Sequence, residues 1–315
     1  MDNYLKEIIK EVCDDLKISV TSLSKDYVML LEKGKKREYI VGNYFPLNSS
    51  SSHLIACDKY ATYEVLKNKN IPVIEHFIAY PWTNLDSYAI GQNQYEDFFS
   101  YFKNNKKHIV VKANNDSCGK NVFEVKTKKE LVRVMDLLFQ NHFSVSLCPF
   151  YEIEREYRVI ILNGKAMYVY SKKRPILVGD GIRTIKELLL EFNPLYYKKE
   201  KYEKNLNYDL SYVPSNGEKI IYNWKFNLSC GSLIVDDVEI KLEKKLINIA
   251  KNVQEALNLS FCSVDIIETI DKELLVLEVN SGVMLKHFSK YIDNGREISK
   301  TIYKKAIEDL FRIKK

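Results

Sequence analysis

The sequence lacks any close pairing of cysteines. Its six cysteines form no CxxC pair and lie far apart in the chain, at Cys13, Cys57, Cys118, Cys148, Cys230 and Cys262. A disulfide framework is not expected in so large a chain, and neither is a cysteine-based zinc site. The spacing therefore favours reduced thiols, as in cytoplasmic proteins.

Long apolar runs and a large charge excess are also missing. The longest apolar runs, such as Val159–Leu162, are far too short to span a bilayer. The first residues are acidic and do not read as a signal peptide. The net charge is only +6 over 315 residues, which permits an acidic or polyphosphate ligand but does not indicate nucleic acid. We expect a soluble cytoplasmic protein with neither a nucleic-acid nor a membrane partner.

The composition is that of an ordinary globular protein, with 46% hydrophobic and 29% charged residues. Apolar residues at helical spacing predict helices over 5–16, 59–67, 242–257 and 298–310, and Asp58 is placed to cap the second. The polar run Asn48–Ser52 reads as a linker. Two segments, 81–95 and 194–210, read as exposed, and for the second a solvated surface is favoured over a nucleic-acid surface.

Short hairpin-linked strands alternate with these helices. One hairpin is predicted across Asn163 and Gly164, and a second joins strands 264–268 and 274–279. Capping boxes begin at Thr127 and Thr184. This mixture favours an α+β protein of several lobes over one doubly wound sheet.

The C-terminal hairpin carries a set of oxygen ligands. Asp265 lies on one strand, and Glu278 and Asn280 lie two residues apart on the next, so they share a face. Two carboxylates and an amide of this kind suit Mg²⁺ bound to nucleotide phosphates. A surface ladder of scattered acids fits the spacing equally well.

A lysine precedes a candidate phosphate loop. Lys112 ends an apolar strand and is followed by a small polar loop and a second strand, Phe123–Val125. Backbone N–H groups of such a loop can bind phosphate. The loop contains only one glycine, Gly119, so it is neither a Walker loop nor a dinucleotide-binding fingerprint.

Several short motifs occur together in a fixed order. They are Asp58-Lys59, Val110-Val111-Lys112, Glu156-Tyr157-Arg158-Val159, Val178-Gly179-Asp180-Gly181, Asn227-Leu228-Ser229, Ser263-Val264-Asp265 and Leu277-Glu278-Val279-Asn280. In this order, from about residue 55 to 290, the chain resembles the ATP-grasp ligases, in particular the ATP-grasp portions of cyanophycin synthetase and bifunctional glutathione synthetase. The resemblance implies an ATP-grasp fold with a small N-terminal lobe (1–55), a central region with the lid (56–150) and a C-terminal subdomain with the metal site (151–315).

The resemblance also implies roles for individual residues. Lys59 and Lys112 match the lysines that neutralise the α- and β-phosphates of ATP, and Gly119 matches the loop that closes over them. The hinge 148–151, with Phe150 and Tyr151, matches the adenine contacts, and Glu156 matches the acid that binds the ribose.

The remaining matches concern catalysis. The resemblance implies that Asp265, Glu278 and Asn280 hold two magnesium ions, and that three residues near the transferred phosphate and the acyl group are Arg158, Arg174 and Asn227. The chain departs from the family pattern at Ala113, Asp116, Asn121 and Pro149. These departures concern the loop and the hinge and leave both lysines and the metal ligands in place.

The implied activity is that of an ATP-dependent carboxylate–amine ligase. The ligase would form an amide or peptide bond on an amino acid or peptide through an acyl phosphate. Two other functions stay open, a kinase on the same fold and a non-catalytic nucleotide-binding module. Because dimers are common in this superfamily, the resemblance also allows a homodimer.

Overall fold

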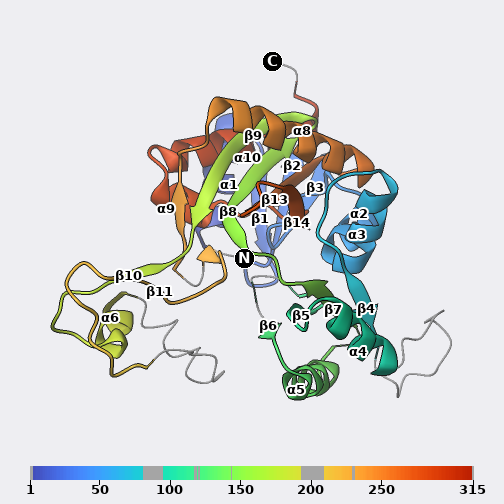
Figure 1. Cartoon of the computed structure of the whole chain (residues 1–315). Coiled ribbons are helices and arrows are strands. Elements are labelled where there is room, and N and C mark those ends of the chain that lie inside the picture. Colours follow the sequence, from blue (N-terminus) through green and yellow to red (C-terminus); the bar gives the residue numbers. More distant parts are fainter. Residues whose placement is uncertain are drawn as a thin grey trace.

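The computed structural model describes residues 3–80, 95–116, 119, 121–142, 144–192, 209–228 and 231–313. The strands form sheets of five, four, three and two strands. Figure 1 shows the five-stranded sheet in the upper part of the molecule, the four-stranded sheet at the lower right and the two-stranded sheet at the lower left. Within the described residues, no helix is both long and apolar enough to cross a membrane.

The central sheet has the antiparallel order β12-β9-β8-β13-β14. Both predicted hairpins lie in it, and the turn between β8 and β9 has positive φ at Asn163 (46°) and Gly164 (75°), as a tight hairpin requires. The strands are β8 Ile153–Leu162, β9 Lys165–Lys173, β12 Leu233–Val235, β13 Phe261–Thr269 and β14 Leu274–Asn280.

Alternation along β8 gives the central sheet two different faces. Tyr157, Val159 and Ile161 pack in the core beneath helix α8 (Ile240–Ala256). Ile160 and Leu162 point the other way, into a second core. On that second face the strand changes from apolar to charged toward its N-terminal end, where Arg158 and Glu156 stand. The charged end of this face forms the floor of the candidate site.

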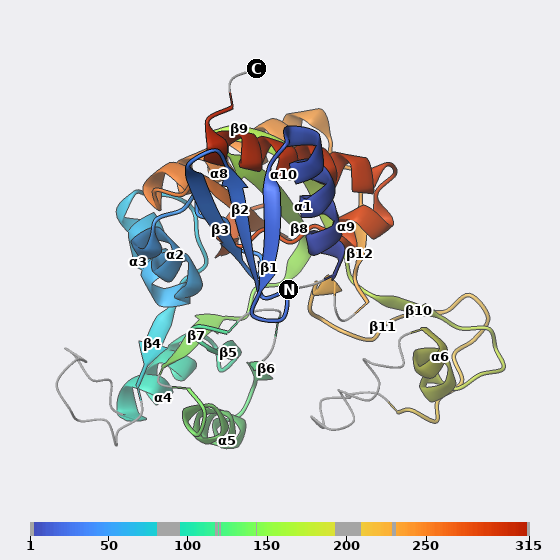
Figure 2. The same ribbon diagram turned by 180° about the vertical axis from the view of Figure 1, so that it is seen from behind.

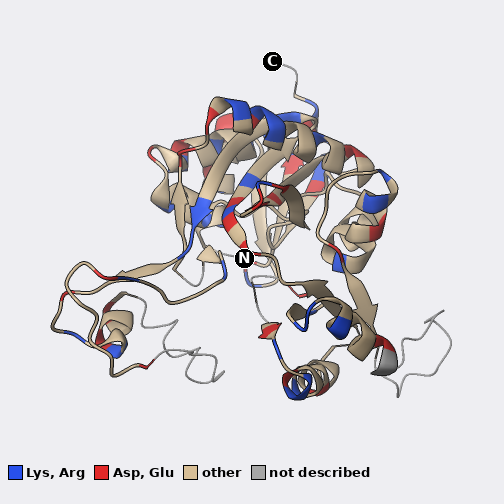
Figure 3. Cartoon of the chain, viewed as in Figure 1, with Lys and Arg blue, Asp and Glu red and all other residues tan. Residues whose placement is uncertain are grey.

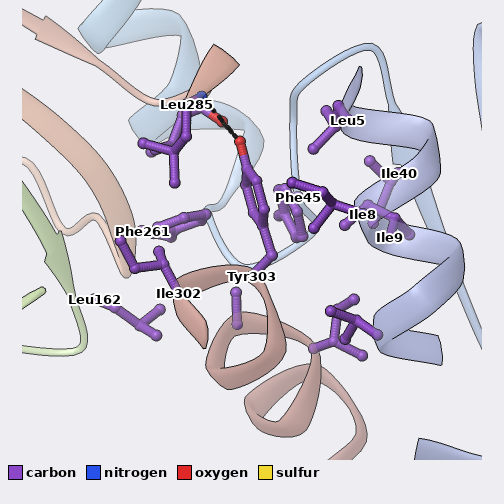
Figure 4. Packing of buried hydrophobic residues seen from close by; sticks show 14 of the residues in the cluster. Leu5, Ile8, Ile9, Ile40, Phe45, Leu162, Phe261, Leu285, Ile302 and Tyr303 are labelled. Atoms are coloured by element: carbon purple, nitrogen blue, oxygen red, sulfur yellow. Dashed lines mark hydrogen bonds between the residues drawn. The ribbon is translucent and has the colours of Figure 1, made fainter. Parts of the chain in front are cut away.

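The N-terminal residues share this second core with the C-terminal helix. Figure 4 shows Leu5, Ile8 and Ile9 facing Phe45 and Tyr303, and the Tyr303 hydroxyl accepts a hydrogen bond of 3.0 Å from the backbone N–H of Leu285. Seen from behind, the three-stranded sheet and α1 lie against α10 (Figure 2). The elements are α1 Asn3–Leu16, β1 Ser19–Leu23, β2 Val28–Lys33, β3 Lys36–Val41, α9 Lys286–Tyr291 and α10 Gly295–Phe311. The division of the chain near residues 55 and 150 stays a prediction.

The polar run 48–52 is not the linker that the sequence predicts. Ser49 caps helix α2 (Ser50–Cys57), because its hydroxyl accepts the backbone N–H of Ser52 at 3.1 Å. The Asn48 amide donates to the carbonyls of Phe261 (2.7 Å) and Ser281 (3.2 Å) and accepts from the N–H groups of Ser260 and Phe261. Through these hydrogen bonds of Asn48, the run binds the N-terminal part of the chain to the region of the central sheet around β13 and β14.

We expect the Asn48→Ala variant to lose about 2–3 kcal/mol of unfolding free energy, because four hydrogen bonds end on this one side chain. Urea denaturation followed by circular dichroism measures the loss. Ser51→Ala, at an exposed position of α2, is the matched control and should unfold at the wild-type midpoint. Equal midpoints for Asn48→Ala and wild type would contradict the role of this side chain.

The four-stranded sheet has the order β4-β7-β5-β6 and its own core. As predicted, Asp58 caps α3 and Thr127 forms a capping box with Glu130 at the start of α5. The elements around this sheet are α3 Lys59–Asn68, β4 Phe77–Ala79, α4 Tyr95–Asn104, β5 Ile109–Ala113, β6 Val122–Val125, α5 Lys128–Phe139 and β7 Val145–Pro149.

The two-stranded sheet of β10 Ile176–Val178 and β11 Lys219–Ile221 packs with α6 Ile185–Phe192. The predicted capping box at Thr184 is confirmed, because its hydroxyl accepts the N–H of Glu187 and its own N–H donates to the Glu187 carboxylate. The predicted exposed segments 81–95 and 194–210 lie almost wholly outside the described residues.

Candidate functional site

A cavity of about 510 Å³ lies where the four-stranded sheet, the central sheet and the N-terminal segment meet. Its volume is in the range of small-molecule sites, about 300–1,000 Å³. Of the residues predicted for the site, all but Arg174 line it, namely Lys59, Lys112, Gly119, Phe150, Tyr151, Glu156, Arg158, Asn227, Asp265, Glu278 and Asn280.

One end of the cavity is apolar and aromatic. Ile74, Val110, Cys148 and Ile267 form a small core there, and Phe150, Tyr151 and Trp224 pack against it. The Phe150 ring stacks on His108 at 4.0 Å and lies 5.7 Å from the ring of Trp224. A flat heteroaromatic group fits such a pocket, because it can stack on the rings while its edges meet backbone groups.

Charged residues cross the floor of the cavity in one row. Arg158 on β8 lies opposite Asp265 on β13, which in turn lies opposite Glu278 on β14. The Arg158 guanidinium donates to both oxygens of Asp265, from Nε at 2.6 Å and from Nη2 at 2.5 Å. The bidentate pair of Arg158 and Asp265 fixes the direction of the Asp265 carboxylate. Figure 3 shows that opposite charges occur on neighbouring strands of the chain.

A second group of charged residues lies beside this row and includes Lys172 on β9, which the sequence analysis missed. Lys172 lies opposite Glu156 and forms an ion pair with it, and its Nζ is also 3.3 Å from Oδ1 of Asp265. All three side chains are buried. Burial opposes ionisation of Asp265, but the adjacent Arg158 and Lys172 outweigh it and lower the pKa of Asp265 to about 2. Burial raises the pKa of Glu156 even though Lys172 opposes the shift.

The predicted magnesium ligands share this face. Asn280 lies opposite Ser263, two positions from the pair of Asp265 and Glu278, so the two carboxylates and the amide line one side of the hairpin. The Asn280 side-chain nitrogen is buried with no hydrogen-bond partner in the described structure. Among all the residues that the structure describes, no three or more His, Cys, Asp or Glu side chains are grouped so that they could hold a metal ion by themselves. A set of two carboxylates and one amide oxygen still fits Mg²⁺ that completes its shell with phosphate oxygens.

Two lysines reach the cavity from the other side. Lys59, in the first turn of α3, donates from Nζ to the backbone carbonyls of Asn114 (3.1 Å) and Asp116 (2.5 Å). Burial lowers the pKa of Lys59, and the charge of Lys112 adds to this effect. Lys112 on β5 is only 6% exposed. The two ammonium groups face the same cavity as the acidic row, so an anion and a divalent cation could bind there together.

Gly119 lies against the segment 224–228. Its φ is +65°, and a Cβ at this position would come within 2.6 Å of the Asn227 side chain. Lys225 donates from Nζ to the Gly119 carbonyl at 3.5 Å. The loop and the segment 224–228 can approach this closely only because residue 119 is glycine. Lys225 and Trp224 line the cavity and were also missed by the sequence analysis.

Arg174 lies just past the end of β9 and does not line the cavity. Its Nη2 donates to the backbone carbonyl of Ile153 at 2.8 Å, and its guanidinium lies 4.9 Å from the ring centre of Phe226. Its Nε is buried without a partner in the described structure. The cation of β9 that does line the cavity is Lys172.

Sequence comparison identifies relatives of this chain. The pattern of the RimK-like ATP-grasp domain matches residues 222–305. The glutathione biosynthesis bifunctional protein GshAB of Clostridium perfringens is 25% identical over 281 residues, which are 83% of this chain and 34% of that protein. Cyanophycin synthetase of Trichormus variabilis is 24% identical over 251 residues, 72% of this chain and 26% of that protein. The chain thus spans between about a quarter and a third of the length of these relatives.

Solved structures share the fold. A bifunctional glutathione synthetase from Pasteurella multocida superposes with a TM-score of 0.58 and 17% identity, over 99% of this chain and 44% of that one. D-alanine–D-alanine ligase from Bacillus anthracis gives a TM-score of 0.54 with 14% identity, over 84% of this chain and 69% of that one. Together with the sequence match, these superpositions show that the chain has the ATP-grasp fold and that residues 222–305 are similar to the RimK-like ATP-grasp domain.

Proposed function

We propose that the chain is an ATP-dependent carboxylate–amine ligase that acts on an amino acid or peptide. The observation that carries this proposal is one cavity that combines an aromatic end, two lysines and a row of carboxylates. An aromatic pocket suits adenine, the lysines suit phosphate, and the carboxylates suit a divalent cation. The relatives and neighbours reported above are named as ligases or synthetases, and none of them favours a kinase.

The residues divide the work as follows. Phe150 and Tyr151 bind adenine, Glu156 binds the ribose, and the phosphates lie between Lys59, Lys112 and the loop at Gly119. Mg²⁺ held by Asp265, Glu278 and Asn280 would neutralise charge on the phosphate oxygens. Arg158 and Asn227 hold the transferred phosphate and the acyl group, and Arg174 is a more distant candidate for the same role.

The reaction has two balanced steps. A carboxylate oxygen of the substrate attacks the γ-phosphorus, the bond to the β-phosphate oxygen breaks, and ADP leaves. The amine nitrogen then attacks the carbonyl carbon of the acyl phosphate, the carbon–oxygen bond breaks, and phosphate leaves as the nitrogen loses a proton. Because water would hydrolyse the acyl phosphate, the loop at Gly119 and the segment 224–228 must cover it during the reaction.

Hydroxylamine tests the proposal directly. The protein is incubated with Mg-ATP, hydroxylamine and a panel of amino acids and short peptides as acids. A ligase gives acid-dependent phosphate release together with a hydroxamate, which mass spectrometry identifies. A kinase gives ADP and a stable phosphorylated product with no hydroxamate, and a binding module gives neither. Either of these last results contradicts the proposal.

Lys112→Ala tests the nucleotide assignment separately from turnover. Mg-ATP should stabilise the wild-type protein by about 2.7 kcal/mol at 100 times its dissociation constant. The variant should lose most of that gain, because the buried ammonium of Lys112 faces the phosphates. Thermal unfolding with and without Mg-ATP measures it, and Lys129→Ala, exposed on α5, is the control. Full stabilisation of Lys112→Ala by Mg-ATP would place the phosphates elsewhere.

A further inference from the structure

The N-terminal part of the chain builds one wall of the cavity. Asn43 and Tyr44, just after β3, line the cavity together with Ser281 and Gly282, which directly follow Asn280. A Cβ on Gly282 would lie 2.6 Å from Nδ2 of Asn43 and 2.7 Å from Cε1 of Tyr44. The two segments are in direct contact because residue 282 has no side chain.

Neighbouring side chains fix the position of Tyr44. The His53 ring on α2 lies 4.7 Å from the Tyr44 ring, edge to face at 67°. A hydrogen bond of 2.7 Å joins His53 Nδ1 to the hydroxyl of Ser281. Tyr44 is nevertheless 41% exposed, so its ring is both held in place and accessible from the cavity.

The adjoining wall is aromatic and apolar as well. Met284, His287 and Phe288 line the cavity, and the Phe288 ring lies 5.6 Å from that of Tyr170. Tyr170 is the partner of Arg158 in the pairing of β8 with β9. This wall therefore begins directly beside the charged row.

The residues of these two walls carry rings, one of them the His287 imidazole, together with a thioether, an amide and two hydroxyls. Among the described residues, every Lys, Arg, Asp and Glu that lines the cavity lies outside them, at Lys59, Lys112, Asp116, Glu156, Arg158, Lys172, Lys225, Asp265 and Glu278. A charged substituent placed between the walls would lose its hydration, and it would meet no Lys, Arg, Asp or Glu there, only the imidazole of His287. An apolar substituent would instead bury its surface against the accessible side chains of Tyr44 and Met284.

We propose that these walls form a side-chain subsite for the substrate that reacts beside Asn280 and Arg158. The subsite takes an amino acid or peptide residue with an uncharged, apolar side chain, and Tyr44 is the specificity-determining residue. The assignment rests on the proposed ligase function, which it deepens by naming the substrate class.

The experiment varies one substrate at a time. In one arm the acid is varied (phenylalanine, leucine, methionine, aspartate, glutamate, lysine and arginine, free and as dipeptides) with hydroxylamine as the amine. In the other arm the same compounds serve as amines with the best acid held constant. The two arms show which substrate the subsite recognises. Calorimetric titration of the compounds into protein with Mg²⁺ and a non-hydrolysable ATP analogue measures binding without turnover.

In one of the two arms, the wild-type protein should use or bind the compounds with apolar side chains at least tenfold better than those with charged side chains. The measured quantity is kcat/KM for turnover or the affinity for binding. Tyr44→Ala should reduce that preference at least tenfold and leave binding of the ATP analogue unchanged. Met284→Lys should raise the relative use of aspartate and glutamate, because it supplies a counter-charge. Tyr39→Ala, on the exposed face of β3, is the control and should keep the wild-type preference.

The outcomes separate the two proposals. Amide formation with no apolar preference, or with a preference that Tyr44→Ala and Met284→Lys both leave unchanged, overturns the subsite and keeps the ligase. Apolar-selective binding that Tyr44→Ala weakens, without any amide or hydroxamate, keeps the subsite and removes the ligase. Failure of every compound to bind or react in both arms overturns the subsite.

Discussion

Glu278→Gln should reduce turnover by at least 100-fold while the protein stays folded. The substitution keeps the shape of the side chain but removes a negative charge that faces the proposed cation and the triphosphate. Glu278 lies on β14, the edge strand of the central sheet, and is only partly buried. We therefore expect the melting temperature to change little. The hydroxamate assay measures turnover, and thermal unfolding without nucleotide measures the fold.

Asp265→Asn is the informative comparison, because Asp265 has a second role. Its carboxylate is buried and paired with both Arg158 and Lys172. Removing the charge leaves these two cations without their common partner, and breaking a buried pair typically destabilises a protein by about 3–5 kcal/mol. We expect Asp265→Asn to lose both turnover and stability. Turnover within a few-fold of wild type in Glu278→Gln would show that the cation lies elsewhere.

The sequence predicts the hairpins of the central sheet but not their exact pairing. From a regular turn at Asn163 and Gly164, Glu156 would pair with Ser171. The structure has a register shift between Ile160 and Ile161, and Lys172 lies opposite Glu156 instead. One inserted residue moves every later side chain of the strand to the other face. The turn residues alone therefore do not predict that Lys172 faces Glu156.

The second hairpin shows the same effect at the proposed metal site. Ile266 pairs with Val276, but the adjacent Asp265 pairs with Glu278, because the register shifts between them. Without this bulge, Leu277 would lie opposite Asp265, and Glu278 would point to the other face. Bulges often re-aim side chains beside active sites. The motif in the sequence locates the ligands, whereas only the structure shows how they come to face one another.

Long-range contacts limit the prediction in the N-terminal part of the chain. The helix at 5–16 is clear from its apolar spacing. The docking of 43–49 depends on backbone groups of Ser260, Phe261 and Ser281 and on the missing side chain of Gly282, all more than 200 residues away. A serine-rich run looks the same in a sequence whether it is a linker or a helix cap with a tertiary anchor. The cavity wall at Asn43 and Tyr44 was therefore not expected.

Substitution of Lys172 on β9 should reduce turnover more than substitution of Arg174, which follows the strand. We expect Lys172→Met to reduce turnover by at least 100-fold and to lower stability by about 3–5 kcal/mol, because Glu156 and Asp265 both lose a buried partner. Lys172→Arg keeps the charge but must fit a larger, planar group at a site that is only 4% exposed, so its loss should be intermediate.

Arg174→Lys provides the contrast. It also keeps the charge, and the contacts that it changes are those to the carbonyl of Ile153 and the ring of Phe226, while Arg174 itself does not line the cavity. We expect a loss of turnover of less than tenfold and normal stabilisation by Mg-ATP. Turnover is compared at saturating ATP for all three variants, with melting temperatures to show which remain folded. If Arg174→Lys loses more turnover than Lys172→Arg while both stay folded, the transferred phosphate contacts Arg174 in the reacting state, and the segment after β9 must move toward the cavity during catalysis.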